Sequence, residues 1–306
     1  MKVIYNGKDI YPDISVSECY VDSYAEKHTD EILLRLNDTA KLWDIWAPEK
    51  GDEIAVENGN VKSGTMFVES ITPEAGIVTL RAFSIPQSLR DKTDKSWEKI
   101  QFTQLAAEIA DKHGLTLELY DVTDQRYDYV EQRKTPDITF LQGRCELEGL
   151  AFLVYDKKLV IYSEAEMEHK ETIDTLEITA ADHFEYRNQD AAHFGEAEIV
   201  NGAIRGTFKA PSGGDKLLRK TLKVKLSGTP EADRFAKNLL RLNNKYSAVA
   251  TLWAGGLLQN YAAGSVVNIK TDSARSWDGP AFITHIRHDI VKGKSKVEFR
   301  KPLEGY

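Results

Sequence analysis

Apolar and polar residues alternate in short runs over the first 83 positions of the chain. Residues 11–17 and 31–37 are candidate strands, and Ile32, Leu34 and Leu36 fall on one face of the second run. Asn58 and Gly59 stand between two further apolar runs. They predict a hairpin turn, because both residues tolerate a positive φ. Strands this short and this closely spaced indicate a small β-barrel.

A strand pattern in this first segment is repeated near the other end of the chain. Residues 51–56 match residues 264–269, both of which begin with glycine. Residues 64–71 match residues 279–286 in the same way. Similarity by accident between glycine-rich turns is the alternative explanation. Matched apolar positions in the same order favour a duplicated antiparallel unit.

A third strand follows in each copy, and here we align Val78, Leu80 and Arg81 with Val297, Phe299 and Arg300. The copies, Gly51–Arg81 and Gly264–Arg300, differ in length only in the turns. Insertions confined to turns are typical of related strand units, since turns on the surface tolerate changes in length. The expected domain organisation is therefore two barrel-like modules in one chain.

The pattern between the copies changes to a helical period. Thr103 is a candidate cap for a helix that ends at Gly114, and residues 115–120 form a candidate strand. A second helix is expected to begin at Thr135 and Pro136, with the proline at the first helical position, and to stop at Gly149. Candidate strands at 151–155 and 159–162 follow. Residues 84–165 thus predict a compact α/β module.

The rest of the chain, 166–306, is assigned to the second barrel. Residues 229–243 carry an apolar stripe behind Thr229 and Pro230, and we expect a helix that caps this barrel. Residues 221–226 alternate as a strand. Residues 172–180 alternate imperfectly, and the segment 170–185 is a candidate to complete the first barrel, 1–83. Residues 184–206 are polar and receive no assignment.

The expected fold class is therefore mainly β with α+β character, in which two related small β-barrel domains flank a compact α/β module. Of the 306 residues, 42% are hydrophobic and 29% are charged, which is ordinary for a soluble globular protein. No apolar run approaches the roughly eighteen residues that a membrane span requires, and the N-terminus does not resemble a signal peptide. The net charge of −8 argues against sequence-specific nucleic-acid binding. Cys19 and Cys145, far apart in sequence, favour two buried, reduced thiols over the alternative of a disulfide.

No arrangement of residues indicates catalysis, a cofactor or a metal. His285 and His288 are three residues apart in a strand, so they point to opposite faces and do not suit one metal ion. His183 and His193 flank a polar segment without a metal-ligand motif. The loop 212–216 resembles a phosphate loop only superficially, because it lacks the Gly-Lys-Ser/Thr ending. We therefore expect no enzyme.

Two charged groups have open interpretations. Glu164, Glu166 and Glu168 share one face if the preceding strand extends through them. A solvated acidic face is the first interpretation and a paired-carboxylate site the second. A basic run follows the loop near residue 215, and it is either a solvated strand face or a docking patch for an acidic partner. This run comprises Lys216, Arg219, Lys220, Lys223 and Lys225.

Several segments together resemble the baseplate hub of contractile phage tails, the late-control D family. Residues 46–54 are similar to the strand-turn segment of that family's first barrel, and residues 135–141 to a helix start. Residues 148–161 are similar to its helix stop and closing hairpin. The helix from Pro230, which leads to Gly264, is similar to the approach to the second barrel. Each motif alone is loose, and the order in which they occur is what makes the resemblance specific. The resemblance covers nearly the whole chain except residues 184–215.

The resemblance implies a structural role. It implies a homotrimer that joins the six-fold tail tube to the trimeric central spike and contacts other baseplate proteins. The two barrels of each subunit would form a ring with pseudo-six-fold symmetry. The implied location is the host cytoplasm during assembly and afterwards the baseplate of a virion or a tail-like bacteriocin. No segment is expected to hold a fused hydrolase or a β-helical spike.

Two other classes remain open at the level of sequence. One is a cell-wall or polysaccharide hydrolase of a tail, which would use two of the many carboxylates. The other is the hub part of a secretion-system spike. Four tryptophans near the repeated strands are candidates either for a subunit interface or for the barrel cores. They are Trp43, Trp46, Trp253 and Trp277.

Overall fold

A computed structural model describes residues 1–179, 182–188, 193–272 and 274–306, and its largest feature is one sheet of fourteen strands. Eight strands come from the first part of the chain: β1 (Lys2–Tyr5), β2 (Lys8–Asp9), β3 (Ser15–Tyr24), β4 (Glu31–Asn37), β5 (Glu53–Asn58), β6 (Val61–Lys62), β7 (Met66–Glu74) and β8 (Ile77–Phe83). Six come from the last part: β14 (Thr175–Ile178), β15 (His183–Asn188), β19 (Ala248–Ala254), β20 (Val266–Thr271), β21 (Gly279–Asp289) and β22 (Lys294–Arg300). The protein is mainly β, as predicted.

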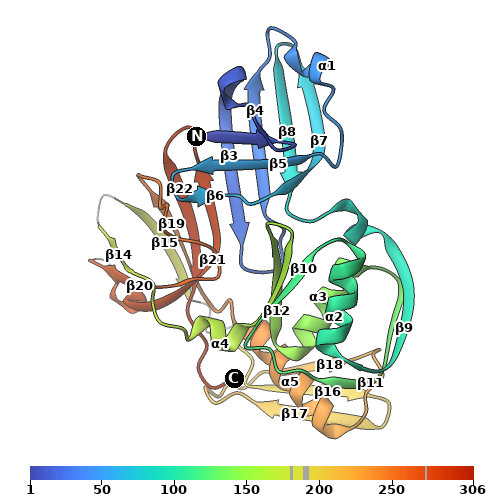
Figure 1. Cartoon of the computed structure of the whole chain (residues 1–306). Helices are drawn as coiled ribbons and strands as arrows, with labels where there is room; N and C mark the ends of the chain where they lie inside the picture. The colour runs from blue at the N-terminus through green and yellow to red at the C-terminus, as the bar shows by residue number, and fades with distance from the viewer. Residues whose placement is uncertain (180–181, 189–192, 273) are drawn as a thin grey trace.

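The two halves of the sheet are joined side by side. Strand β21 pairs antiparallel with β3, so the strand order runs without a break from β15 to β2. In the first half, β1 and β5 cross the direction of β3, β4 and β8 (Figure 1), and buried residues from all these strands form one apolar core. No pairing among the described residues closes either half into a barrel, so the predicted barrels are not confirmed.

Strand order and register support the duplication. The order β3-β4-β8-β7-β5 in the first half corresponds to β15-β19-β22-β21-β20 in the second. The ladder β7–β8 has a bulge between Val68 and Ser70, and the ladder β21–β22 has one between Ile283 and His285. In the sequence alignment these are matching positions. A shared bulge is a specific structural feature, since bulges are retained within families.

Backbone hydrogen bonds at the start of each unit also match. The Gly51 amide donates to the carbonyl of Val68 over 2.8 Å, and the Gly264 amide donates to the carbonyl of Ile283 over 2.8 Å. The third strand, however, needs a correction. The shared bulge places Leu80 beside Ile71 and Val297 beside Ile286, so Leu80 corresponds to Val297 and not to Phe299. The predicted alignment was two residues out of register, a shift that keeps every side chain on its face.

The segment 170–185 belongs to the second half of the sheet, contrary to the prediction that it completes the first barrel. Strand β14 pairs parallel with β20, and β15 pairs antiparallel with β19. The hydrogen bond from the Ile173 amide to the carbonyl of Val266, 2.8 Å long, begins this attachment. The imperfect alternation of residues 172–180 could not decide between two similar strand partners.

The central α/β module has its own core. It contains β9 (Lys92–Gln101), α2 (Phe102–Lys112), β10 (Thr116–Tyr120), β11 (Arg126–Pro136), α3 (Asp137–Glu148), β12 (Leu150–Tyr155) and β13 (Lys158–Ser163). Helices α2 and α3 were predicted, but Gln101 and not Thr103 caps α2, through a reciprocal contact with Gln104. Pro136 precedes the first helical residue of α3 and does not occupy that position. Gly149, at φ +70°, ends α3 as expected.

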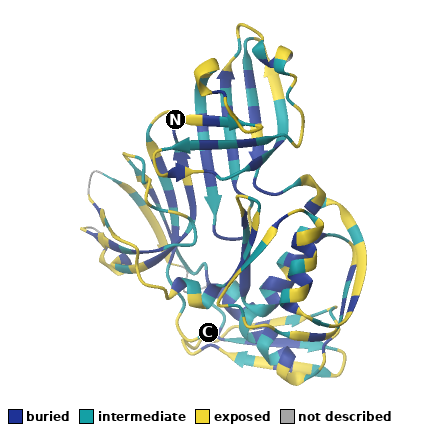
Figure 2. Ribbon diagram, in the orientation of Figure 1, coloured by how far each residue is buried: buried dark blue, intermediate teal, exposed yellow. Residues whose placement is uncertain are grey.

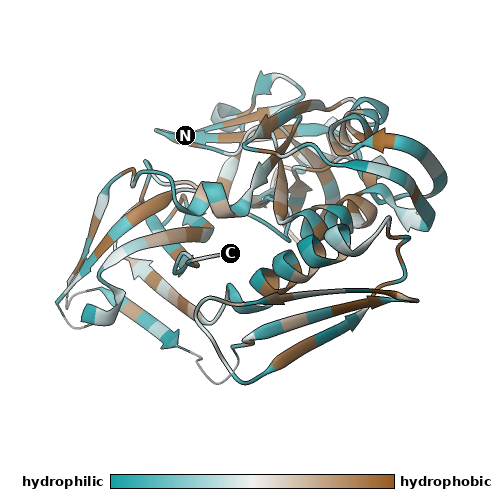
Figure 3. Ribbon diagram, turned by 90° about the horizontal axis from the view of Figure 1, so that it is seen from below, coloured by the Kyte–Doolittle hydropathy of each residue, from teal (hydrophilic) through white to brown (hydrophobic). Residues whose placement is uncertain are grey.

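A further layer packs beneath this module. Strands β16 (Glu196–Asn201), β17 (Ile204–Lys209) and β18 (Leu217–Thr221) form a small sheet, and α5 (Thr229–Asn244) lies against it (Figure 3). The predicted helix is present to within a residue, but it covers this sheet and not the second half of the large sheet. Residues 221–226 were predicted as a strand, but only Thr221 belongs to β18 and residues 222–226 are not a strand. The side-chain amide of Asn201 donates to the carbonyls of Leu222 and Val224.

Short helices complete the structure: α1 (Leu42–Trp46), α4 (Glu164–Glu168), η1 (Tyr11–Asp13), η2 (Gln87–Arg90) and η4 (Arg275–Trp277). Buried and partly exposed residues alternate along the long strands (Figure 2), in keeping with one inward face per strand. Cys19 and Cys145 are buried free thiols, as predicted. Trp43 and Trp277 are core residues, whereas Trp253 is exposed.

Candidate functional site

The residues considered for metal binding do not come together. In the described part of the chain no three His, Cys, Asp or Glu side chains are close enough to hold a metal ion. His183 stacks on Trp253 with ring centroids 4.4 Å apart, and His193 contacts the Ser212 hydroxyl at 2.8 Å. The loop 212–216 leads directly into strand β18 and not into a helix, so it lacks the setting of a phosphate loop.

His285 and His288 lie on opposite faces of β21, as their spacing predicted. His285 Nε2 lies 2.7 Å from the Asp22 carboxylate, and its ring stacks on Tyr24 with centroids 4.2 Å apart. His288 contacts the Ser295 hydroxyl at 2.9 Å, and burial lowers the pKa of His288 to about 4. The first histidine is therefore part of an ionic contact and the second is a neutral, buried side chain.

The ionic contact of His285 spans the seam between the two halves of the sheet. Asp22 in β3 is buried, and Arg287 in β21 donates to it through Nε over 2.8 Å. Burial acts to lower the pKa of His285, but hydrogen bonds with Asp22 and Glu298 outweigh it, and the pKa is raised. The contact with His285 in turn lowers the pKa of Glu298 to about 2. The seam thus holds His285 between two carboxylates.

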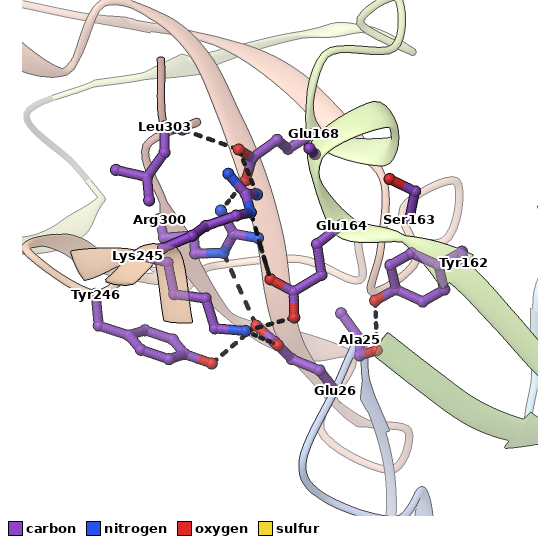
Figure 4. A network of polar contacts seen from close by, with 12 residues as sticks. Ala25, Glu26, Tyr162, Ser163, Glu164, Glu168, Lys245, Tyr246, Arg300 and Leu303 are labelled. Atoms are coloured by element: carbon purple, nitrogen blue, oxygen red, sulfur yellow. Dashed lines mark hydrogen bonds and ion pairs between the residues drawn. The ribbon is translucent and has the colours of Figure 1, made fainter. Parts of the chain in front are cut away.

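The most unusual group of side chains lies where α4, α5, β22 and the loop after β3 meet (Figure 4). Three carboxylates and three cationic groups are buried together there. We call them the buried ion network: Glu26, Glu164, Glu168, Arg241, Lys245 and Arg300. Opposite charges are equal in number, which is what makes their joint burial tolerable.

Glu168 is one centre of this network. It pairs with Arg300 of β22, lies 2.6 Å from Nη2 of Arg241 in α5 as an ion pair, and accepts a hydrogen bond from the Leu303 amide at 3.0 Å. Its neighbours raise the pKa of Arg300 further, although burial acts in the opposite direction. One carboxylate therefore ties α4, α5 and the C-terminal strand together.

Lys245 is the second centre. Its ammonium group pairs with Glu26 and lies 2.6 Å from Glu164, and Tyr246 donates to Glu26 over 2.9 Å. Burial acts to raise the pKa of Glu26, but Lys245, a hydrogen bond with Glu164 and Arg300 hold it well below its usual range. Burial raises the pKa of Glu164 to about 7, despite the attraction of Lys245. The pKa values of the two carboxylates are therefore shifted in opposite directions.

This network overturns the interpretation of Glu164, Glu166 and Glu168 as a solvated strand face. The segment is the short helix α4, which Ser163 caps by accepting from the Glu166 amide. Residues four apart share a helix face, so Glu164 and Glu168 turn inward while Glu166 is exposed. The acidic spacing was visible in the sequence, but its cationic partners come from residues 241–300.

The basic run is divided between several contacts. Arg219 pairs with Glu198 of β16, which also contacts Arg205 at 3.2 Å. Lys225 lies over the ring of Tyr129, 5.3 Å from its centroid. The run is largely exposed, as a solvated strand face would be. None of the described helices is long and apolar enough to cross a membrane.

The chain shares its fold with proteins of phage tails. It aligns with the 43 kDa tail protein of prophage MuSo2 from Shewanella oneidensis at a TM-score of 0.76 and 13% identity, covering 98% of each chain. It aligns with a tail protein from Neisseria meningitidis at 0.76 and 14% identity, covering 98% of this chain and 95% of the other.

The chain also aligns with a component of the type VI secretion system from E. coli at a TM-score of 0.63 and 10% identity, covering 100% of this chain and 79% of the other. That component is itself structurally similar to the T4 bacteriophage tail proteins gp27 and gp5. No protein-family model matches the sequence, and no curated protein matches it. These similarities define the fold, since the identities are low.

Proposed function

We propose that this protein is a structural component of a phage tail or tail-like particle, and specifically the baseplate hub of the late-control D type. In this role a homotrimer joins the six-fold tail tube to the trimeric central spike and contacts other baseplate proteins. The observation that carries the proposal is the duplicated strand unit, with one strand order and one bulge position in both copies. The shared fold of tail proteins supports it.

The duplication suits a symmetry mismatch. A three-fold object seats on a six-fold tube only if each subunit presents two equivalent surfaces. In the proposed ring, the units Gly51–Arg81 and Gly264–Arg300 act as barrel-like parts at similar radius, related by about a sixth of a turn. Such a particle would assemble in the host cytoplasm and end in the baseplate of a virion or tail-like bacteriocin.

The proposed role is structural and not enzymatic. The charged groups that are buried together pair with one another across four segments, which is the arrangement of a structural clamp. A cell-wall hydrolase is the alternative from the sequence, and a turbidity assay on purified cell walls distinguishes it. The hub part of a secretion-system spike is a second candidate, favoured by the fold of the E. coli secretion component. Neighbouring genes for a tail tube and sheath, or for a secretion apparatus, separate these two.

Light scattering after size-exclusion chromatography tests the proposed assembly. The expected mass is three times the 34.5 kDa of one chain, alone or after the spike protein is added. Trp253 is exposed and is a candidate for the interface, so Trp253→Glu should lower the trimer fraction while Ile45→Glu, at another exposed apolar residue, should not. A stable dimer, or a monomer even with spike present, contradicts the proposal.

A further inference from the structure

A cleft of about 600 Å³ lies where the two halves of the large sheet meet the central module. Its floor is the outer face of the β10–β13–β12 sheet. One wall consists of β3 and β21, and the other consists of the turn after β5 and the loop before β20. Its volume is within the range of about 300–1,000 Å³ that is typical of ligand sites.

Four tyrosines line this cleft, and three of them, Tyr120, Tyr155 and Tyr261, come from outside the wall that β3 and β21 form. Tyr120 of β10 and Tyr155 of β12 are among the most exposed large apolar side chains, at 43% and 36%. Tyr261 lies before β20. Each of these three hydroxyls is engaged: Tyr120 donates to Glu118 over 3.1 Å, Tyr261 to Asp174 over 2.9 Å, and Tyr155 to the Lys62 carbonyl over 3.5 Å. The rings are therefore held in place with part of their surface open to the cleft.

Three side-chain amides form the rim. The Asn60 side chain donates to Asn260 over 2.8 Å, and its backbone amide donates to Gln259 over 3.2 Å. These contacts use the NH₂ group of Asn60 and the side-chain oxygens of Gln259 and Asn260. The other polar atoms of the three amides are the carbonyl oxygen of Asn60 and the NH₂ groups of Gln259 and Asn260. An amide group offers both a donor and an acceptor, which matches a hydroxyl group that is itself both.

The charged residues of the cleft are balanced in number, since Asp30 and Glu118 stand against Lys62 and Lys158. Glu118 on the floor contacts Lys158 at 2.7 Å. Asp30 accepts from the Tyr24 amide, and burial raises the pKa of Asp30 to about 7. Opposite the floor, β3 and β21 are paired with each other, so this wall has no open strand edge for a peptide backbone. The cleft therefore favours a neutral ligand with many hydroxyl groups and an apolar face.

We propose that this cleft binds a neutral oligosaccharide of roughly two or three sugar rings, a size that suits its volume. Sugar rings present an apolar face of C–H groups, which stacks on tyrosine, and equatorial hydroxyl groups, which bind amides and carboxylates. This binding activity goes beyond the proposed structural role and does not depend on trimer formation.

Isothermal titration calorimetry of the protein tests the proposal, with N-acetylchitotriose, cellotriose and maltotriose as the neutral sugars. At least one is expected to bind, and Tyr120→Ala and Tyr155→Ala should each weaken it at least tenfold. Tyr11→Ala is the matched control, because Tyr11 is 40% exposed and does not line the cleft. It should leave the affinity unchanged.

Thermal unfolding of each variant shows whether the fold is intact. Asn260→Asp is a second, milder change that keeps the shape of the rim and should also weaken binding. The proposal is wrong if none of the three sugars binds the folded protein at 10 mM, a concentration chosen for weak ligands. It is also wrong if binding is insensitive to Tyr120→Ala and Tyr155→Ala, or if a neutral peptide of the same length binds and the sugars do not.

Discussion

Glu168 illustrates how one buried carboxylate depends on its partners. Its side chain is fully buried and pairs with Arg241 and Arg300. Glu168→Gln removes the charge and leaves two buried guanidinium groups with too few anions. Removing one partner of a buried ion pair typically costs about 3–5 kcal/mol. We expect a loss of this order in the free energy of unfolding, measured by urea titration.

The matched control for this change is on the same helix. Glu166 is exposed and two residues away from Glu168, so Glu166→Gln should change the free energy of unfolding by less than about 0.5 kcal/mol. Equal effects of the two substitutions would contradict a structural role for the buried ion network.

His285 makes the seam sensitive to pH. Its pKa in the folded state is raised, because hydrogen bonds with Asp22 and Glu298 outweigh burial. A raised histidine pKa contributes stability that is fully present below the unfolded value, about 6.5, and is lost as the pH rises through the folded value. The midpoint of urea unfolding should therefore fall between pH 6.5 and pH 9 by more in the natural protein than in His285→Gln. Identical pH profiles would exclude this contribution.

Gly206 shows how closely β17 approaches α5. A Cβ atom at this position would lie 2.2 Å from the backbone of Ala232, which is rigid. We expect Gly206→Ala to separate the strand from the helix and to destabilise the protein by about 1–3 kcal/mol, as overpacking does. Differential scanning calorimetry measures the change in melting temperature.

Gly143 in α3 is the opposite case and serves as the control. Its Cβ position is open, and it lies within a helix. Gly143→Ala should stabilise the protein by roughly 0.5–1 kcal/mol, since alanine is the better helix former. A destabilising effect of the same size at both positions would mean that the contact with Ala232 is not the cause.

The elements that could be predicted from the sequence are those with a strong local signal. Helix α5 carries its apolar stripe behind Thr229 and Pro230, and Gly149 supplies the left-handed end of α3. The spacing of Glu164, Glu166 and Glu168 was ambiguous, because positions i, i+2 and i+4 suit a strand face and positions i and i+4 suit a helix face. Their partners, Lys245 and Arg300, are distant in sequence, and no local pattern connects them.

Non-local pairing also explains the errors in topology. A shift of two residues in a strand preserves the inward face, so the apolar pattern could not fix the register of β8 against β22. Similarly, the pattern of residues 172–180 did not distinguish β20 from a strand of the first half. The cleft could not be predicted, since Asn60, Tyr120 and Tyr261 meet only after all three parts of the chain have packed.

The whole molecule is held together by two features at different ends of β21 and β22. The seam pairs β3 with β21 over residues 285–289, and the buried ion network joins β22 to α4 and α5. These contacts combine residues from both halves of the large sheet with the small sheet and its helix. These contacts favour a chain that moves as one body.

Hydrogen exchange tests whether the two halves of the sheet behave as one body. Amides in a hinge between independent units exchange through local opening, whereas amides in a continuous core exchange only when the whole unit unfolds. The amides of Ala25 and Ile290, which donate to Thr284 and Cys19 across the seam, are the positions to follow. We expect their protection to equal that of core amides in β4 and β22.

In Asp22→Asn, which removes the charge opposite His285 and Arg287, the protection of these two amides should fall while that of β4 is retained. Faster exchange at the seam than in both flanking strands of the unsubstituted protein would show a hinge there, and a rigid subunit with two fixed, equivalent surfaces would then have to be abandoned.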